Sequence, residues 1–213
     1  MKKYILFDND GVLVETEMWY FEASKRALKE FFGLELTFER YMDIMAKGQR
    51  AWVIAEEIGI SEEEIVKARV KRDEYYQEYI RTKNIAIDGV KDVLKELSKN
   101  YKMGIVTTSR RVDFELAHAG RGIVDFMEFV LCVEDYPRSK PHPDPYLKGV
   151  ELFGAKKDEC IVVEDSKRGL SSAYNAGIEC AIVYNEFTAT HDFSQATYKI
   201  ENLKDLVGLL EKV

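Results

Sequence analysis

Two aspartates, one residue apart, follow a short apolar run near the start of the chain. The run Tyr4–Phe7 is followed by Asp8 and Asp10, and Gly11 then permits a sharp turn. Such a run is typical of a strand buried on both faces of a parallel sheet, and open α/β sheets bind their ligands at the carboxyl ends of their strands. Alternate residues of an extended chain point the same way, so the two carboxylates would share one small site.

Two carboxylates in one small site repel each other. The repulsion is relieved when a cation lies between them or when one of them holds a proton, and both arrangements are typical of catalysis. Asp8 and Asp10 are therefore candidate catalytic residues. A solvated loop that happens to carry two acids is the alternative, so other segments must decide.

A cluster of hydroxyl side chains follows a second apolar run. Ile105 and Val106 lead into Thr107, Thr108 and Ser109. Hydroxyls and free backbone amides at the start of a helix can bind the oxygens of an anion. Taken alone, the same residues could simply cap a helix.

A lysine precedes a proline-rich segment. Lys140 is followed by Pro141, Pro143 and Pro145, which restrict the backbone and could fix the direction of the lysine side chain. A lysine held in this way is a candidate charge partner for the aspartate pair. A surface lysine in a loop is the alternative.

A second pair of acids ends a third apolar run. The run 161–163 leads into Glu164, Asp165 and Ser166, which repeats the pattern of the first strand. Together with Asp8, these acids would offer several carboxylate oxygens, which suit Mg²⁺ better than zinc because no His or Cys lies in these segments. Asp165 could instead belong to a helix cap.

Composition excludes several classes of protein. The chain has 213 residues, 46% of them hydrophobic, which is enough for one large domain or for a core with a smaller inserted domain. A net charge of −7, without a block of basic residues, disfavours nucleic acid as a partner. We expect no membrane span and no signal peptide, hence a cytoplasmic protein. Cys132, Cys160 and Cys180 lack metal-ligand spacing and are expected to be buried, reduced thiols.

The hydrophobic pattern divides the chain into a helical insert and a region of alternating elements. Over residues 15–84 it is helical, with a helix at 38–46 and a capping box of Ser61 and Glu64 before a long charged helix. The later pattern predicts helices at 90–97, 112–119, 146–153, 170–176 and from 203, and strands at 103–106, 129–132, 161–163 and 181–184. This alternation indicates a parallel, doubly wound α/β sheet, with the helical insert over its carboxyl edge.

These residues, in this order, resemble the motifs of the haloacid dehalogenase superfamily of phosphotransferases. The match covers essentially the whole chain: Asp-x-Asp-Gly at Asp8, a Thr after the second strand at Thr107, a Lys before Pro-x-Pro-Asp at Lys140, and Glu-Asp-Ser at Glu164 with Gly169 downstream. The chain is most similar to the branch with a helical cap between the first two motifs. That branch includes sugar-phosphate phosphatases, phosphoglycolate phosphatase and β-phosphoglucomutase.

The resemblance implies a catalytic core over residues 1–14 and 86–213 and a helical cap over residues 15–85. In these relatives the first aspartate attacks phosphorus, so Asp8 would become an aspartyl-phosphate. Asp10 would protonate the leaving alcohol and later take a proton from water.

The same resemblance implies a Mg²⁺ cofactor and a set of phosphate-binding groups. The ion would be held by Asp8, the backbone carbonyl of Asp10, Glu164 and Asp165. The equatorial phosphate oxygens would be bound by Thr107, the amide of Thr108, and Lys140.

The implied cap should close over the site and contribute specificity. Family caps send a substrate loop from about the position of residues 47–50, where Gly48 interrupts the helical pattern. Gln49 and Arg50 are the candidate substrate contacts, and an exposed, solvated arginine is the alternative. Arg110 and Arg111, next to the hydroxyl residues, could likewise contact the substrate or be exposed and solvated.

Some features of the relatives are absent. β-Phosphoglucomutase-like members carry a cap histidine near the acid/base aspartate, whereas this chain has Tyr20 in that neighbourhood and histidines only at 118, 142 and 191. This disfavours a mutase. Haloacid dehalogenases lack the second aspartate, so Asp10 disfavours dehalogenation. Phosphonate-cleaving relatives need a cap lysine, for which Lys47 is the candidate, although no feature indicates a desolvated amine there.

We therefore expect a Mg²⁺-dependent phosphatase that hydrolyses a small phosphorylated metabolite, such as a sugar or polyol phosphate. A phosphomutase of the β-phosphoglucomutase type is one alternative. A non-catalytic module that binds phosphometabolites or proteins is another, because a fold does not determine a function. We expect a monomer or small homo-oligomer with no nucleic-acid or membrane partner.

Overall fold

The structure, a computed structural model, describes residues 1–47 and 49–212. The chain divides into two compact units, Met1–Glu15 with Ala86–Val213, and Thr16–Ile85. Every strand in the described residues belongs to the first, which we call the α/β unit. The second consists of helices and loops, and we call it the inserted unit.

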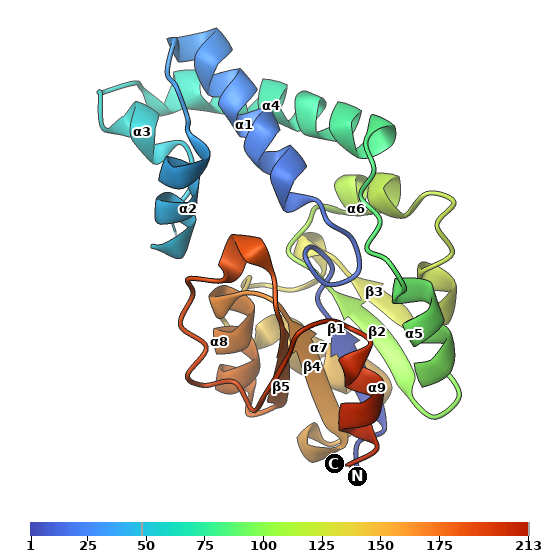
Figure 1. Cartoon of the computed structure of the whole chain (residues 1–213). Helices are drawn as coiled ribbons and strands as arrows, with labels where there is room; N and C mark the ends of the chain where they lie inside the picture. Colours follow the sequence, from blue (N-terminus) through green and yellow to red (C-terminus); the bar gives the residue numbers. More distant parts are fainter. Residues whose placement is uncertain (48, 213) are drawn as a thin grey trace. The chain divides into compact units, whose positions relative to one another are not determined.

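A parallel sheet of six strands forms the centre of the α/β unit, in the order β3-β2-β1-β4-β5-β6 (Figure 1). The strands are β1 (Tyr4–Phe7), β2 (Lys102–Val106), β3 (Phe129–Leu131), β4 (Cys160–Glu164), β5 (Glu179–Val183) and β6 (Tyr198–Ile200). β1 is central, with Leu6 paired with Gly104 on one side and Val162 on the other. The predicted doubly wound parallel sheet is confirmed.

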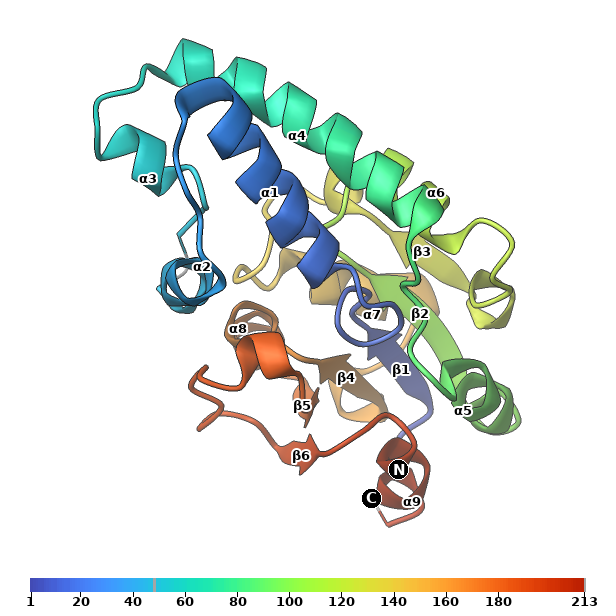
Figure 2. The same cartoon turned by 45° about the horizontal axis from the view of Figure 1, so that its top comes forward.

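Helices cover both faces of this sheet. The α-helices are α5 (Val90–Leu97), α6 (Arg111–His118), α7 (Asp144–Phe153), α8 (Lys167–Ala176) and α9 (Asp205–Leu210), and the short 3₁₀ helices are η1 (Val124–Phe126), η2 (Val133–Asp135), η3 (Lys157–Glu159) and η4 (Glu186–Thr188). α7 packs against α8 on one face and α5 against α9 on the other (Figure 2). Because both faces are covered, Ile5, Leu6 and Phe7 are fully buried.

A glycine lets α7 approach the sheet closely. A Cβ atom at Gly149 would lie 2.6 Å from Leu6 Cδ2. One turn earlier, Tyr146 is fully buried in the apolar cluster that contains Leu6, Val106 and Val162. This packing anchors α7, and with it the preceding segment that contains the predicted lysine, against the central strands.

The inserted unit contains the helices α1 (Glu17–Phe32), α2 (Phe38–Ala46), α3 (Val53–Glu56) and α4 (Glu62–Thr82). α1 and α4 lie side by side (Figure 1), with Ala23 and Ala27 of α1 fully buried. Ser61 and Glu64 form the predicted capping box at the start of α4. No strand occurs in residues 16–47 or 49–85, as predicted.

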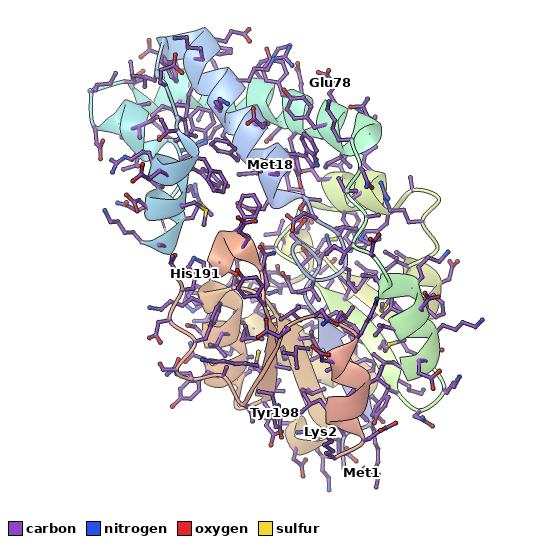
Figure 3. The ribbon with its side chains drawn as sticks, viewed as in Figure 1. Met1, Lys2, Met18, Glu78, His191 and Tyr198 are labelled. Carbon is purple, nitrogen blue, oxygen red and sulfur yellow. The ribbon has the colours of Figure 1, made fainter. Side chains whose placement is uncertain are left out.

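The edge strand β6 has no counterpart among the predicted strands. It has three residues, of which Lys199 is exposed, so it lacks the apolar run that indicates a buried strand. Tyr198 Oη and Lys2 Nζ both bind Glu179 Oε2, at 3.2 Å and 3.1 Å, which joins this edge to β5 and to the start of the chain (Figure 3). The helices predicted at 38–46 and 90–97 have the predicted bounds, and the ends of the remaining predicted elements differ from the observed ones by a few residues.

The three cysteines are buried free thiols, as predicted. Burial raises the pKa of Cys160 to about 11 and that of Cys132 to about 12, so both remain protonated at neutral pH. No helix in the described part of the chain combines the length and the apolar character needed to cross a membrane.

Candidate active site

The candidate site lies at the carboxyl end of β1. Asp8 N donates a 2.9 Å hydrogen bond to Val163 O, which extends the pairing of β1 and β4 beyond the last strand residue of β1. Asp8 is almost fully buried, and a tight turn follows at Gly11, whose φ is 78°. A Cβ atom on Gly11 would lie 2.1 Å from Asp165 Oδ2. The glycine therefore lets the first loop approach the second acidic segment.

Lys140 joins the ends of three neighbouring strands. Its Nζ donates to Asp8 Oδ1 at 2.6 Å, to Glu164 Oε1 at 2.8 Å and to Val106 O at 2.8 Å. The lysine is only 5% exposed, and these three acceptors satisfy its three donors and offset the cost of burying its charge. Residues far apart in the sequence thus meet in one charged network.

Glu164 is fully buried and accepts hydrogen bonds on both oxygens. Oε1 accepts from the lysine and from Tyr146 Oη, the latter at 2.7 Å. Oε2 accepts from Ser166 Oγ at 3.1 Å and from the backbone amides of Asp165 and Ser166. A Cβ atom at Gly169 would lie 1.7 Å from Glu164 Oε1, so the first turn of α8 accommodates this carboxylate only with a glycine there.

Burial and neighbouring charges shift the pKa values of this network. Burial, followed by the charge of Glu164, raises the pKa of Asp8 to about 7, although Lys140 opposes the shift. Burial opposes the charge on Lys140, but Asp8 and Glu164 outweigh it and raise the pKa of the lysine. Burial would raise the pKa of Glu164, but the lysine outweighs it and lowers that pKa. One ammonium contacts two carboxylates, so further positive charge at this point would stabilise the ionised forms of both acids.

Three acids at this point could hold a divalent cation. One carboxylate oxygen from each of Asp8, Glu164 and Asp165 lies within 4.8 Å of the others, and all three residues are buried. Carboxylate oxygens are the ligands that Mg²⁺ prefers. Asn185 Nδ2 donates to Asp165 Oδ2 at 3.0 Å and thereby orients that carboxylate. The residues present therefore fit the ion.

The carboxylate of Asp10 contacts a different set of groups. Ser109 Oγ donates to Asp10 Oδ2 at 2.7 Å, and Thr107 Oγ1 lies 3.4 Å from the same oxygen. The backbone amide of Ser109 donates in turn to Thr107 Oγ1 at 3.0 Å. The two aspartates thus have different environments, an ammonium beside Asp8 and hydroxyls beside Asp10.

The two predicted threonines differ in exposure. Thr107 is fully buried, and its carbonyl oxygen accepts a 2.6 Å hydrogen bond from Tyr136 Oη. Thr108 is half-buried, and its Oγ1 accepts a 3.0 Å hydrogen bond from Arg168 Nη2. Tyr136 and Arg168 therefore each donate a hydrogen bond to the segment with Thr107 and Thr108.

The predicted substrate loop belongs to the inserted unit. Gln49 and Arg50 are exposed, and the amide of Gln49 donates to Ile44 O at 3.1 Å. Gly48 lies outside the described residues. The contact of Gln49 and Arg50 with a substrate stays a prediction.

Asn185 and Tyr146 contact the buried acids of this site and were not selected from the sequence. Asn185 follows β5 at the same edge of the sheet, so the rule that selected Asp165, a polar residue just after a buried strand, could have found it. Tyr146 lies within α7, where an aromatic residue indicates core packing, and its hydroxyl contact has no local signal.

The residue between the two aspartates is held from α6. Asn9 Oδ1 and His118 Nε2 are 2.6 Å apart, and both residues are buried. The carbonyl oxygen of Asn9 accepts hydrogen bonds from the amides of residues 12–14, which closes the loop. Burial lowers the pKa of His118 to about 4, so the ring is neutral at neutral pH and can donate from Nε2.

The chain is similar to several known proteins. Among curated proteins, pyrophosphatase PpaX of Bacillus mycoides is 24% identical over 98% of this chain and 97% of its own. Protein CbbY of Rhodobacter capsulatus is 27% identical over 94% of this chain and 93% of its own. Among solved structures, CbbY of Rhodobacter sphaeroides in complex with xylulose-1,5-bisphosphate superimposes with a TM-score of 0.82. The similarity covers 97% of this chain and 96% of that one at 20% identity, which shows a shared fold.

The motif resemblance is confirmed at the level of the family. The model of the haloacid dehalogenase-like hydrolases matches residues 5–183, a range that includes all of the acids, hydroxyls and the lysine described above. Because that match covers most of the chain, this protein belongs to the haloacid dehalogenase-like hydrolase family.

Proposed function

We propose that this protein is a Mg²⁺-dependent phosphatase that hydrolyses a small phosphorylated metabolite, such as a sugar or polyol phosphate. One observation carries the proposal. The Asp8 carboxylate lies at the end of the central strand, 2.6 Å from the buried ammonium of Lys140. A carboxylate in this position is a nucleophile that a phosphate anion can approach, because the lysine offsets the repulsion between them.

The two aspartates would divide the chemistry. In the first step a carboxylate oxygen of Asp8 bonds to phosphorus, the bond from phosphorus to the alcohol oxygen breaks, and Asp10 gives its proton to that oxygen. In the second step Asp10 takes a proton from water, whose oxygen bonds to phosphorus. The bond between phosphorus and the Asp8 oxygen breaks, inorganic phosphate leaves, and the Asp8 carboxylate is regenerated. The hydrogen bond from Ser109 holds Asp10 in place for both transfers.

The proposed phosphate-binding groups include the lysine beside Asp8 and the two threonines that follow β2. Thr107 and the amide of Thr108 would bind the equatorial oxygens, and Lys140 would exchange one of its three present acceptors for such an oxygen. Together these groups would stabilise the charge of the transition state. Asp8, Asp165, Glu164 and the backbone carbonyl of Asp10 would hold the metal. A bound Mg²⁺ supplies positive charge that reduces the repulsion between the nucleophile and the phosphate. The inserted unit would act as the cap, with Gln49 and Arg50 contacting the substrate.

The relatives support a small phosphorylated substrate. PpaX is named a pyrophosphatase, and one CbbY structure contains xylulose-1,5-bisphosphate. The buried thiols, none of them in a disulfide, support a reducing compartment such as the cytoplasm. No contact of the described residues favours a mutase over a phosphatase.

The test measures phosphate release from p-nitrophenyl phosphate and from a panel of sugar and polyol phosphates, with Mg²⁺ and with a chelator. We expect the wild type to release phosphate only with Mg²⁺ and Asp8→Asn to be inactive. Asp158→Asn, the same change at an exposed position, should keep full activity. Turnover by Asp8→Asn would remove Asp8 from its role. Isomerised sugar phosphate as the main product would identify a mutase, and binding without turnover would identify a non-catalytic module.

A further inference from the structure

One arginine beside the phosphate-binding loop is not accounted for by the proposed chemistry. Arg168 lies in the first turn of α8 and is exposed. Its Nη2 donates a 3.0 Å hydrogen bond to Thr108 Oγ1, which joins the start of α8 to the loop after β2. Thr108 directly follows Thr107, so the guanidinium lies at the rim of the proposed phosphate site.

Arg168 differs from most arginines of the α/β unit because it has no carboxylate partner in the described residues. Its neighbours at this end of the sheet form ion pairs: Arg110 with Asp113, Arg111 with Asp135, and Arg138 with Asp144. The partner of Arg168 is a neutral hydroxyl. A guanidinium has five N–H donors, and oxyanions with two oxygens match its planar fork. Donors therefore remain available for a second ligand.

The backbone around Arg168 is firmly held. Gly169 N donates to Ser166 Oγ at 3.1 Å, and Ser166 Oγ in turn donates to Glu164 Oε2. On the other side, Lys167 N donates to Nδ1 of His191, which Figure 3 labels, at 3.3 Å. Arg168 therefore projects from a fixed turn rather than from a mobile loop, which reduces the entropy lost when it binds a ligand.

Thr108 connects the arginine to the phosphate loop. Its hydroxyl accepts from Arg168, which leaves its own proton free to be donated to an anion. An anionic group at the rim could then accept from the guanidinium and from the hydroxyl together. Both groups are neutral or positive, so they would attract such an anion without the repulsion that the three buried acids exert.

We propose that Arg168, with Thr108, binds a second anionic group of the substrate, a phosphate or a carboxylate, and so makes the enzyme selective for doubly anionic phosphate esters. This inference rests on the proposed phosphatase function and names the substrate class of that same site. A phosphate and a carboxylate share the oxyanion chemistry that a guanidinium recognises.

The test compares matched substrates that differ in the second group. Xylulose-1,5-bisphosphate is compared with xylulose 5-phosphate, and phosphoglycolate with 2-hydroxyethyl phosphate. For at least one pair we expect the wild type to favour the doubly anionic member in kcat/KM. Arg168→Gln should reduce that preference about tenfold, mainly through KM, because one charge-assisted interaction is lost. The pair that responds shows whether the second group is a phosphate or a carboxylate.

Arg121→Gln is the matched control. Arg121 is the other arginine of the α/β unit without a carboxylate partner among the described residues, and it lies just after α6, where it donates to Ala117 O at 2.6 Å. It should leave both ratios unchanged. The inference is overturned if the wild type shows no preference in either pair, or if Arg168→Gln lowers kcat/KM equally for all four substrates and p-nitrophenyl phosphate.

Binding separates this inference from the proposed function. In an Asp8→Asn background, calorimetry measures the affinity for each of the four compounds with no turnover. We expect Arg168→Gln to weaken only the doubly anionic member of the responding pair, again about tenfold. Unchanged affinity would reject the role of Arg168 even if the enzyme is a phosphatase. A wild type without phosphatase activity would reject the function while the binding comparison still decides the role of Arg168.

Discussion

Ser109 Oγ donates a 2.7 Å hydrogen bond to Asp10 Oδ2, and this contact joins the loop after β2 to the loop after β1. A hydroxyl donor restricts the rotation of the carboxyl group that accepts from it. Ser109 is therefore a positioning residue for the proposed acid and base. Its effect should depend on how strongly the leaving group needs a proton.

Ser109→Ala should reduce kcat/KM for an alkyl phosphate about tenfold. An alkoxide is a poor leaving group, so its departure depends on a well-placed proton donor. p-Nitrophenolate leaves without protonation, and p-nitrophenyl phosphate should therefore be affected much less. Steady-state kinetics on both substrates test this.

Ser98→Ala is the control, since Ser98 Oγ donates to Lys95 O on the exposed end of α5. It should change neither value. Equal losses on the two substrates would show that Ser109 shapes the loop as a whole rather than acting through Asp10.

Tyr146→Phe should lower the free energy of unfolding by about 1–2 kcal/mol. The change removes one hydrogen-bond donor from the fully buried Glu164, and the aromatic ring that fills the core is retained. Urea denaturation measures the loss. Tyr184→Phe, at a side chain that is 57% exposed, should have little effect. Equal stabilities of the two variants would mean that the tyrosine hydroxyl does not support the buried network.

Gly169→Ala should damage both the fold and the activity. The new Cβ would lie 1.7 Å from Glu164 Oε1, so the carboxylate or the first turn of α8 must move. Because Glu164 also binds Lys140, the displacement would reach the proposed nucleophile. We expect lower thermal stability and a large loss of phosphatase activity.

Gly208→Ala in α9 is the matched control, because beyond its chain neighbours and the backbone of its own helix no described atom lies within 4 Å of the added Cβ. Alanine favours a helix over glycine, so this variant should be as stable as the wild type or more stable by up to about 1 kcal/mol. If Gly169→Ala behaves like Gly208→Ala, the close approach of α8 to Glu164 is not a constraint.

The sequence predicted those parts of the fold that have a strong local signal. α5 has the predicted bounds, because its apolar residues recur at helical spacing between a glycine and polar residues. The short edge strand β6 has no comparable signal. At the site, Asp8 and Asp165 were selected because each follows a predicted strand, and Lys140 because the prolines after it restrict its backbone. The structure brings the three together.

The polar contacts that support the site could not be predicted in the same way. Tyr146 binds Glu164, and His118 binds Asn9, across large separations in sequence. Each pairing depends on how a helix is rotated and how closely it packs on the sheet. Hydrophobic periodicity places such a residue on the buried face but does not identify the polar atom that it meets.

His118 should make the stability of the protein depend on pH. Its pKa is lowered from 6.5 to about 4, first by burial and also by Arg121, so the unfolded chain binds a proton more readily than the folded one. As pH falls from 6.5 towards 4, protonation favours unfolding. The cost is roughly 2 kcal/mol at pH 5 and roughly 3 kcal/mol below pH 4, at 1.36 kcal/mol per pKa unit.

His118→Gln removes this titration and keeps an N–H donor for Asn9. Urea denaturation at pH 7 and pH 5 should show that the free energy of unfolding falls less for this variant than for the wild type, by roughly 2 kcal/mol. His142→Gln, at an exposed position, should follow the wild type. The contrary result is an equal loss of stability for all three proteins between pH 7 and pH 5. It would mean that the buried ring of His118 is protonated as readily as in the unfolded chain and that its hydrogen bond to Asn9 tolerates a charged imidazole.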